Sequence, residues 1–302
     1  MQVATSTLNA TLLSQSLKVQ ADHGEALTQQ ASGERSASLA GLDGRAGQTV
    51  SLRSDLDASA NRVGHAQTAQ SMVEVSYQAV SSIADTLAAA QSEIAAALNG
   101  AVTDTKGLKS QAEAWLATTE STLNTDFAGT PVFGGAGATG SPVTLGAADD
   151  PDTAAGETGP AYYQGSPHPR TLMIDGETRL DYGVTADAAG FDATLRGLSL
   201  LAGMATTPPD TAVLQEAYAL LEDATMDMGR MLEDLSGQAD SLTVLIDRET
   251  EFQLFAESAL ESVESVDLAE AAARVSELEV VLEASYAALA SLTTISLHDY
   301  LR

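Results

Sequence analysis

The sequence predicts a mainly α-helical protein: a long antiparallel helical bundle or coiled coil formed by the N- and C-terminal arms, with a small β-rich insert domain in the middle. Three observations predict it. Apolar residues recur at alternating steps of four and three along both arms, the spacing of a heptad seam. All eight prolines lie between Pro131 and Pro209, which leaves both flanks free to form helices. Aromatic residues make up only 4% of the chain, which favours narrow seams over a compact core.

The N-terminal arm begins with a weakly amphipathic helix. Within residues 1–30 the apolar side chains fall on two separate lines, Leu8, Leu12 and Val19 on one and Leu13, Leu17 and Leu27 on the other. A short, polar-rich helix of this kind needs a partner to be stable.

A much stronger seam follows and predicts one helix of about 70 Å. Its positions are Leu52, Leu56, Ser59, Val63, Ala66, Gln70, Val73, Tyr77, Val80, Ala84, Leu87, Gln91, Ile94 and Leu98. Asn99-Gly100 is a stop signal. The spacing of Leu108, Ala112, Trp115 and Leu123 then predicts a shorter helix that runs back.

The middle of the chain has a different composition. Thirteen of the 24 glycines lie between the first and last proline. Thr171 to Ile174 and Glu177 to Val184 flank Asp175-Gly176, a dipeptide favoured in two-residue hairpin turns. We therefore expect a β-hairpin within a small β-rich domain.

The C-terminal arm opens at Pro208-Pro209-Asp210 and contains two further seams. The first is Leu214, Tyr218, Leu221, Thr225, Met228, Leu232, Leu235, Ala239, Leu242 and Ile246; the second is Leu268, Ala271, Val275, Leu278, Leu282, Ser285, Leu289, Leu292 and Ser296. A break is expected between Ser262 and Asp267, and Asp267 with Glu270 forms a capping pair for the last helix.

These patterns divide the chain into five parts. They are an N-terminal helix and loop (1–45), the first part of a helical rod (46–130), a small β-rich domain (131–209), the second part of the rod (210–262) and a C-terminal helix (263–302).

Composition excludes several classes of function. Forty-two acidic residues against 14 basic ones give a formal net charge of −28, so nucleic acid and anionic membrane are not expected as partners. Cysteine is absent, which removes disulfides and thiol chemistry. The first 20 residues lack both a basic region and an uninterrupted apolar stretch, so a cleaved signal peptide is not expected.

No motif nominates a catalytic, cofactor-binding or metal-binding residue, and the chain is not expected to be an enzyme. Residues 135–140 match the G-x-G-x-x-G nucleotide fingerprint, but Ser141-Pro142 follows instead of a helix. Asp149, Asp150 and Asp152 lack the closing Glu of a calcium loop. The four histidines have no ligand spacing.

Three segments resemble motifs of the flagellin family. Gln30-Ala31-Ser32-Gly33-Glu34-Arg35 looks like the element that follows the first helix of the family. The segment from Phe127 to Gly135, FAGTPVFGG, is similar to the turn that leaves the helical arm for the outer domain. The stretch from Asp267 to Leu301 resembles the C-terminal helix, in the form found at the junction of hook and filament more than in the filament itself.

The resemblance covers the two arms and implies a function. It implies a self-assembling structural protein that joins the flagellar hook to the filament, exported by the flagellar type III system and located outside the cell. Implied partners are further copies in a ring, a neighbouring hook-associated protein, flagellin, and an export chaperone on the C-terminal helix. A filament flagellin with a short outer domain is the first alternative, and a non-flagellar coiled-coil adhesin or signalling protein is the second.

The expected assembly interface is made by the terminal helices, with no cofactor. Its residues are Leu8, Leu12, Leu13, Leu17, Leu268, Val275, Leu278, Leu282, Leu289 and Leu292. One seam is expected to face its own chain and another a neighbouring copy.

Overall fold

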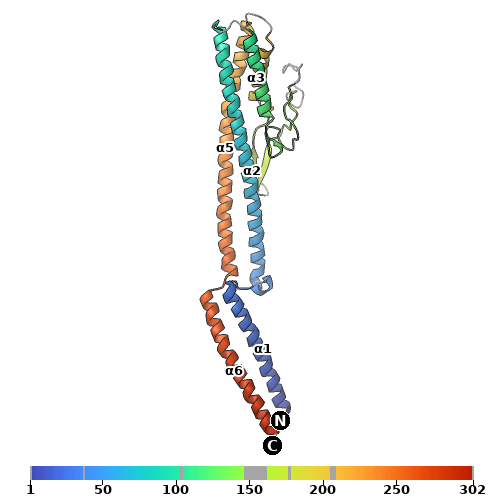
Figure 1. Ribbon diagram of the computed structural model, residues 1–302, viewed down its shortest axis with the longest axis vertical. Helices are drawn as coiled ribbons and strands as arrows, with labels where there is room; N and C mark the ends of the chain where they lie inside the picture. The colour runs from blue at the N-terminus through green and yellow to red at the C-terminus, as the bar shows by residue number, and fades with distance from the viewer. Residues whose placement is uncertain are drawn as a thin grey trace. The chain divides into compact units, whose positions relative to one another are not determined.

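A computed structural model describes residues 2–36, 38–101, 105–145, 162–175, 178–204 and 209–300. The helices are α1 (Gln2–Ser32), the 3-10 helix η1 (Leu39–Arg45), α2 (Ala46–Leu98), α3 (Thr105–Leu123), α4 (Ala189–Ala202), α5 (Thr211–Glu264) and α6 (Leu268–Tyr300). The strands are β1 (Asp126–Phe127), β2 (Thr130–Pro131), β3 (Arg170–Asp175) and β4 (Thr178–Tyr182). Figure 1 shows these elements, and the predicted mainly α fold with a small β-containing insert is confirmed.

The chain forms two compact units. The larger unit is Ala60–Glu251, and the smaller one combines Met1–Ser59 with Phe252–Arg302.

In the larger unit, α2 and α5 form the predicted pair of long antiparallel helices. Their direction follows from three side-chain hydrogen bonds: Gln91 to Thr225 (3.1 Å), Gln70 to Thr243 (2.9 Å) and Arg62 to Glu249 (2.8 Å). In this order the residue numbers fall along α2 and rise along α5, so the two helices run antiparallel. The heptad seams are buried at every seventh residue, at most 2% exposed: Ala66, Val73, Val80, Leu87 and Ile94 on α2, and Leu214, Leu221, Met228, Leu235 and Leu242 on α5.

Two positions of the predicted α2 seam are exceptions. Tyr77 is 43% exposed and Leu98 is 37% exposed. Ser76 and Ala97, their neighbours in sequence, are buried in their place. The second line of the seam therefore lies one residue earlier than predicted and keeps the seven-residue spacing, at Ala69, Ser76, Ile83, Ala90 and Ala97.

The shorter helix that follows is confirmed as α3, but α4 lies within the insert and was not predicted. Phe191, Leu195, Leu198 and Leu201 of α4 are completely buried. Its two glycines suggested irregular structure, whereas they serve close packing. A Cβ at Gly197 would lie 2.6 Å from Cδ2 of Leu221, so glycine lets α4 approach α5. The 131–209 segment thus contains the helix α4 besides its strands.

The predicted hairpin exists as β3 and β4, which are antiparallel. Asp175 pairs with Thr178 and therefore belongs to strand β3. The sequence had predicted it in the turn. Leu172, Ile174, Leu180 and Tyr182 are packed against the core, which explains why the strands extend up to the turn.

The segment that resembles the family turn is a second, very short hairpin. Ala128 and Gly129 connect β1 and β2 with positive φ angles of 51° and 77°, the combination of a type I′ turn. Gly135 opens the G-x-G-x-x-G match, and Ala136 N–H donates to His168 O at 2.9 Å. After Gly140 the chain continues to Val143, which bridges to Tyr163, so no helix opens there as nucleotide binding requires.

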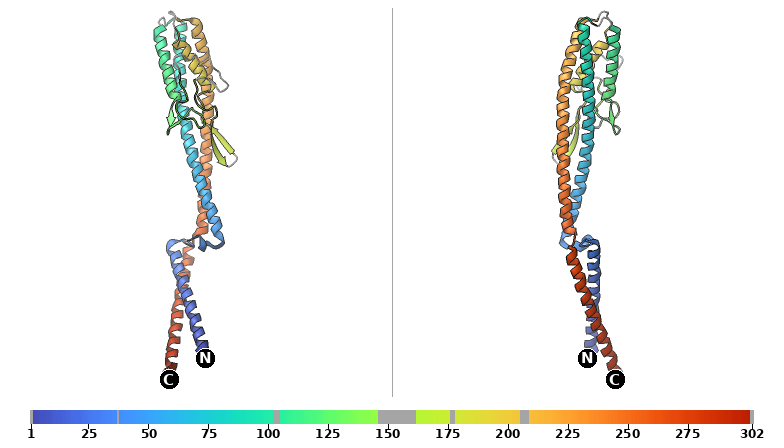
Figure 2. Two further views of the ribbon diagram at one scale, coloured as in Figure 1. Left: turned by 90° about the vertical axis from the view of Figure 1, so that its right-hand side faces the viewer. Right: turned by 60° about the vertical axis from the view of Figure 1, so that its left-hand side comes forward.

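The smaller unit contains α1 and α6, which pack against each other. Figures 1 and 2 show the two chain ends at the same end of this pair, so the helices run antiparallel. Among the described residues, no helix has both the length and the apolarity needed to cross a membrane. The acidic residues 149, 150 and 152 lie outside the described residues.

Candidate assembly surface

The α1–α6 pair buries one line of small and aliphatic side chains from each helix. Ser16 and Ala26 of α1 are 4% and 1% exposed, with Leu12 and Val19 half-buried on the same line. On α6 the line is Ala271, Val275, Leu278, Leu282, Ser285 and Leu289, the seam read from the sequence. Serine and alanine at central positions allow close approach but contribute little burial, so the pair is narrow.

The structure places only part of the expected interface in this contact. Leu12, Val275, Leu278, Leu282 and Leu289 are buried or half-buried in the pair. The other positions are exposed or undescribed: Leu13 is 53% exposed, Leu17 58% and Leu268 55%, whereas the side chains of Leu8 and Leu292 lie outside the described ones.

Leu13 and Leu17 belong to a second heptad line on α1, which is exposed along its whole length. The line is Leu13, Leu17, Gln20, Gly24, Leu27 and Ala31, with alternating steps of four and three. It lies roughly 100° around the helix from the buried line, because neighbouring residues are separated by that angle. One partner helix cannot cover both lines, so α6 leaves this one open.

Helix α6 also exposes apolar residues beyond its contact with α1. Val280 is 67% exposed and Tyr286 51%, and Ala273, Ala284 and Ala287 are exposed near them. A helix that is apolar on several sides is typically enclosed on several sides. Within the part of the chain that the structure describes, the helix that packs most extensively against α6 is α1.

Exposed large apolar side chains concentrate in the smaller unit. Of the 16 such residues among those described, 11 lie in this unit, although it has the smaller part of the chain. They are Leu13, Leu17, Leu27, Leu39, Val50, Leu254, Phe255, Leu268, Val280, Val281 and Tyr286. These side chains are therefore the candidates for an interaction surface.

The two ends of the α1–α6 pair differ in their content of charged residues. Residues 2–17 and 284–298 contain no Asp, Glu, Lys or Arg, in a chain whose charged fraction is 19%. Both stretches lie at the end of the pair where the termini meet. Four of the five acidic residues of α6, Glu270, Glu277, Glu279 and Glu283, precede the uncharged stretch, and Asp299 follows it. This end can approach another copy of an otherwise acidic chain without direct charge repulsion.

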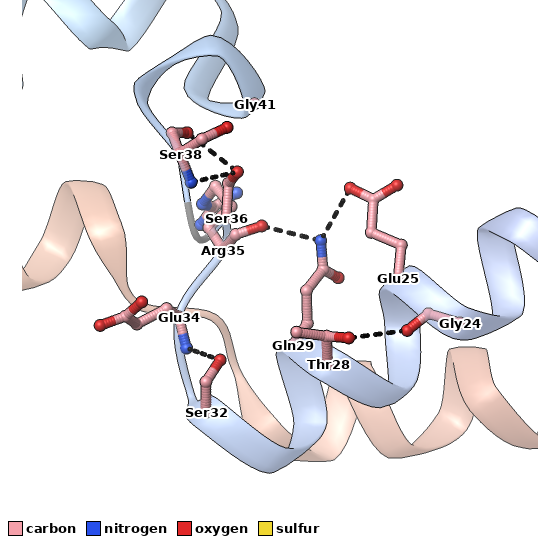
Figure 3. Close-up of a pocket in the computed structure, with 10 residues that line it drawn as sticks. All are labelled: Gly24, Glu25, Thr28, Gln29, Ser32, Glu34, Arg35, Ser36, Ser38 and Gly41. Atoms are coloured by element: carbon pink, nitrogen blue, oxygen red, sulfur yellow. Dashed lines mark hydrogen bonds between the residues drawn. The ribbon is translucent and has the colours of Figure 1, made fainter.

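A polar pocket of about 380 Å³ lies where α1 ends and the loop to η1 begins. Figure 3 shows its lining residues: Gly24, Glu25, Thr28, Gln29, Ser32, Glu34, Arg35, Ser36, Ser38 and Gly41. Gln29 Nε2 donates to Arg35 O at 2.8 Å and to Glu25 Oε1 at 3.4 Å. The lining lacks the apolar side chains that small-molecule sites favour, and these bonds fix the loop.

The geometry defines a mainly helical protein whose paired terminal helices leave apolar lines uncovered. No protein-family model matches the sequence, and no curated protein matches it. The structure is similar to that of a protein from Vibrio parahaemolyticus described as a flagellar hook-associated protein, with a TM-score of 0.58 and 13% identity over 72% of this chain and 96% of that one. At 13% identity this likeness shows a shared fold, the one that the resembling motifs predicted.

A second solved structure is FlgL from Bacillus cereus. Its TM-score is 0.41 at 11% identity, over 68% of this chain and 98% of that one. At this score the likeness is too distant to support any statement about function.

Proposed function

We propose that this chain is a structural protein of the bacterial flagellum that self-assembles at the junction of hook and filament. The observation that carries the proposal is the shared fold with the Vibrio hook-associated protein, whose length is covered almost completely. The sequence motifs at residues 30–35, 127–135 and 267–301 point to the same family.

The proposed mechanism is mechanical. The open line of one copy, centred on Leu13, Leu17 and Leu27, packs against the exposed side of α6 in the next copy, around Val280 and Tyr286. The two surfaces differ and lie on different helices, so the contact is head-to-tail, and repetition of such a contact gives a ring or a helical array. Leu12, Leu278 and Leu282 hold the pair together within each copy.

Net charge limits where copies can meet. With a formal charge of −28 per chain, close contact through the acidic segments is opposed by repulsion. The uncharged stretches 2–17 and 284–298 are the part of the molecule where this cost is least, and we place the tightest contacts there.

The remaining roles follow from the proposed location. The insert faces outward, the hook-associated neighbour and flagellin contact the ring from its two sides, and an export chaperone covers the exposed apolar residues of α6 before assembly. Export proceeds through the flagellar type III system without a cleaved signal peptide. The protein has no enzymatic role in this proposal.

Immunogold labelling of intact flagella tests the proposal, with an antibody against the insert. We expect one band at the distal end of the hook. Labelling along the whole filament would identify the chain as a filament flagellin. Labelling on cells but not on flagella would overturn the proposal in favour of a non-flagellar coiled-coil adhesin or signalling protein.

A further inference from the structure

The break between α5 and α6 occurs in a sequence that contains no helix breaker. The residues from Ser262 to Leu268 include no glycine or proline, and neither occurs anywhere after Gly237. Serine, valine and aspartate are only moderately poor helix formers. The capping residue Asp267 marks where α6 begins, but local propensity does not explain why α5 stops at Glu264, so an interaction at the C-terminus of α5 is required.

That interaction comes from the other end of the chain. Arg35 N–H donates to Glu264 O at 2.6 Å, and its guanidinium donates to Ser265 O at 3.2 Å. Val266 N–H donates in turn to Gly33 O at 2.9 Å. The last carbonyls of a helix lack intrahelical donors and carry partial negative charge, so a cationic donor there is doubly favourable. Arg35 thus caps α5 from 230 residues away.

The loop that carries Arg35 is itself fixed by α1. Gly33 has a φ of +74°, and its N–H donates to Gln29 O at 2.9 Å, which ends α1 with a left-handed glycine. The Gln29 side chain also holds the carbonyl of Arg35. On the other side of the break, Asp267 Oδ1 accepts from Ala269 N–H at 2.8 Å and so caps α6.

We propose that the α5–α6 break is conditional: docking of residues 33–35 holds it open, and without this docking α5 and α6 join into one continuous helix. The break turns α6 onto α1, and α1 supplies the loop that makes the break. The pairing of the terminal helices and the break therefore form together.

The amides of Asp267 and Leu268 report the two states. In the broken state neither amide donates a hydrogen bond, whereas in a continuous helix they would donate to Val263 O and Glu264 O. Hydrogen exchange at these two amides is therefore fast with the break and slow without it. The Cα chemical shifts of residues 265–267 give an independent reading of helix formation.

The test uses the full-length monomer. Arg35→Ala with Asp267→Ala removes both caps, and we expect exchange at positions 267 and 268 to slow by about tenfold or more. Arg53→Ala with Asp267→Ala is the matched control, because Arg53 pairs with the side chain of Glu264 (2.7 Å) and not with its carbonyl. The control should keep fast exchange.

A rescue variant separates a joined helix from general unfolding. Leu268 is the first residue of α6, a position that tolerates proline, whereas proline within a continuous helix is strongly disfavoured. Adding Leu268→Pro to the double variant should restore fast exchange at position 267 while the rest of α6 stays protected. Unchanged exchange in the double variant, equal slowing in the control, or loss of protection throughout α6 would each overturn the proposal.

Discussion

Phe133 and Phe191 meet edge to face, with ring centroids 5.6 Å apart and ring planes at 79°. Phe133 follows the β1–β2 turn and Phe191 lies in the first turn of α4, and both side chains are completely buried. Ala186 N–H also donates to Phe133 O at 3.0 Å. This pair anchors the start of the insert to its end.

Replacing either ring should therefore destabilise the larger unit. Phe191→Ala removes buried aromatic surface and leaves a cavity, for which we expect a loss of about 3–5 kcal/mol in the free energy of unfolding. Chemical denaturation followed by circular dichroism measures it. Met173→Ala, at a 46% exposed site on β3, is the control and should change stability by less than about 0.5 kcal/mol. A loss of similar size in both variants would contradict the anchoring role.

Alanine substitutions at two helical glycines should change the stability of the protein in opposite directions. Gly197→Ala places a Cβ 2.6 Å from Cδ2 and 3.0 Å from Cγ of the buried Leu221, so α4 and α5 must move apart at a cost of about 1–3 kcal/mol. Gly229→Ala, also within a helix, meets nothing within 4 Å and should stabilise the protein by about 0.5–1 kcal/mol. Midpoints of thermal unfolding should shift in opposite directions.

The same glycines show where sequence reasoning was limited. The heptad seams of α2 and α5 predicted long helices because their apolar residues recur at a spacing that places them on one face of a helix. In the sequence Gly190 and Gly197 indicated backbone freedom, but their role depends on packing against Asp227 and Leu221 of the next helix, α5. The helix α4 was missed for this reason.

The candidate assembly surface on α1 and α6, like the fold, was predictable in part from the sequence. The α6 seam at Val275, Leu278 and Leu282 was visible in the sequence because these residues lie on one face of the helix. The two lines of α1 were visible in the sequence, but only the fold shows that α6 covers the line of Leu12 and leaves that of Leu13 open. The role of Arg35 depends on contacts with residues 264 and 265 that no local pattern contains.

Alkaline pH should destabilise the larger unit through its buried tyrosines. Burial raises the pKa of Tyr162 well above its ordinary value, with a smaller contribution from the charges of Asp192 and Asp187, and burial likewise raises the pKa of Tyr163. The unfolded chain then loses these protons first. Stability is retained below the unfolded pKa of 10.0 and falls as pH rises above it, by up to about 1.4 kcal/mol per pH unit for Tyr162 and by less for the half-buried Tyr163, whose charge solvent screens.

Urea denaturation between pH 8 and 11 checks this dependence. Tyr162→Phe loses the hydrogen bond to Ala186 O (3.2 Å) and should be less stable at pH 8 by about 1 kcal/mol, with a shallower decline above pH 10. Tyr77→Phe alters a 43% exposed side chain and should leave the decline in place. An equally steep decline in Tyr162→Phe would show that other groups control the alkaline transition.

Two substitutions on the terminal helices should separate folding from assembly. Leu17 is 58% exposed on the open line of α1, so Leu17→Asp places a carboxylate in solvent and should leave the helix content and stability of the monomer within about 0.5 kcal/mol of the original. Leu282 is 8% exposed within the α1–α6 pair, so Leu282→Asp puts an unpaired charge in the contact at a cost of several kcal/mol.

In the proposed ring, however, Leu17 is covered by the next copy, and Leu17→Asp should abolish self-association as completely as Leu282→Asp does. Sedimentation velocity on concentrated protein measures association, and hydrogen exchange across residues 10–30 and 268–290 measures the pair. We expect Leu282→Asp to lose protection in both segments and Leu17→Asp to retain it. Lys18→Asp, which changes the neighbouring exposed residue outside both lines, controls for added negative charge. If Leu17→Asp assembles like the original chain while Lys18→Asp does too, the open line of α1 is not the surface that joins one copy to the next.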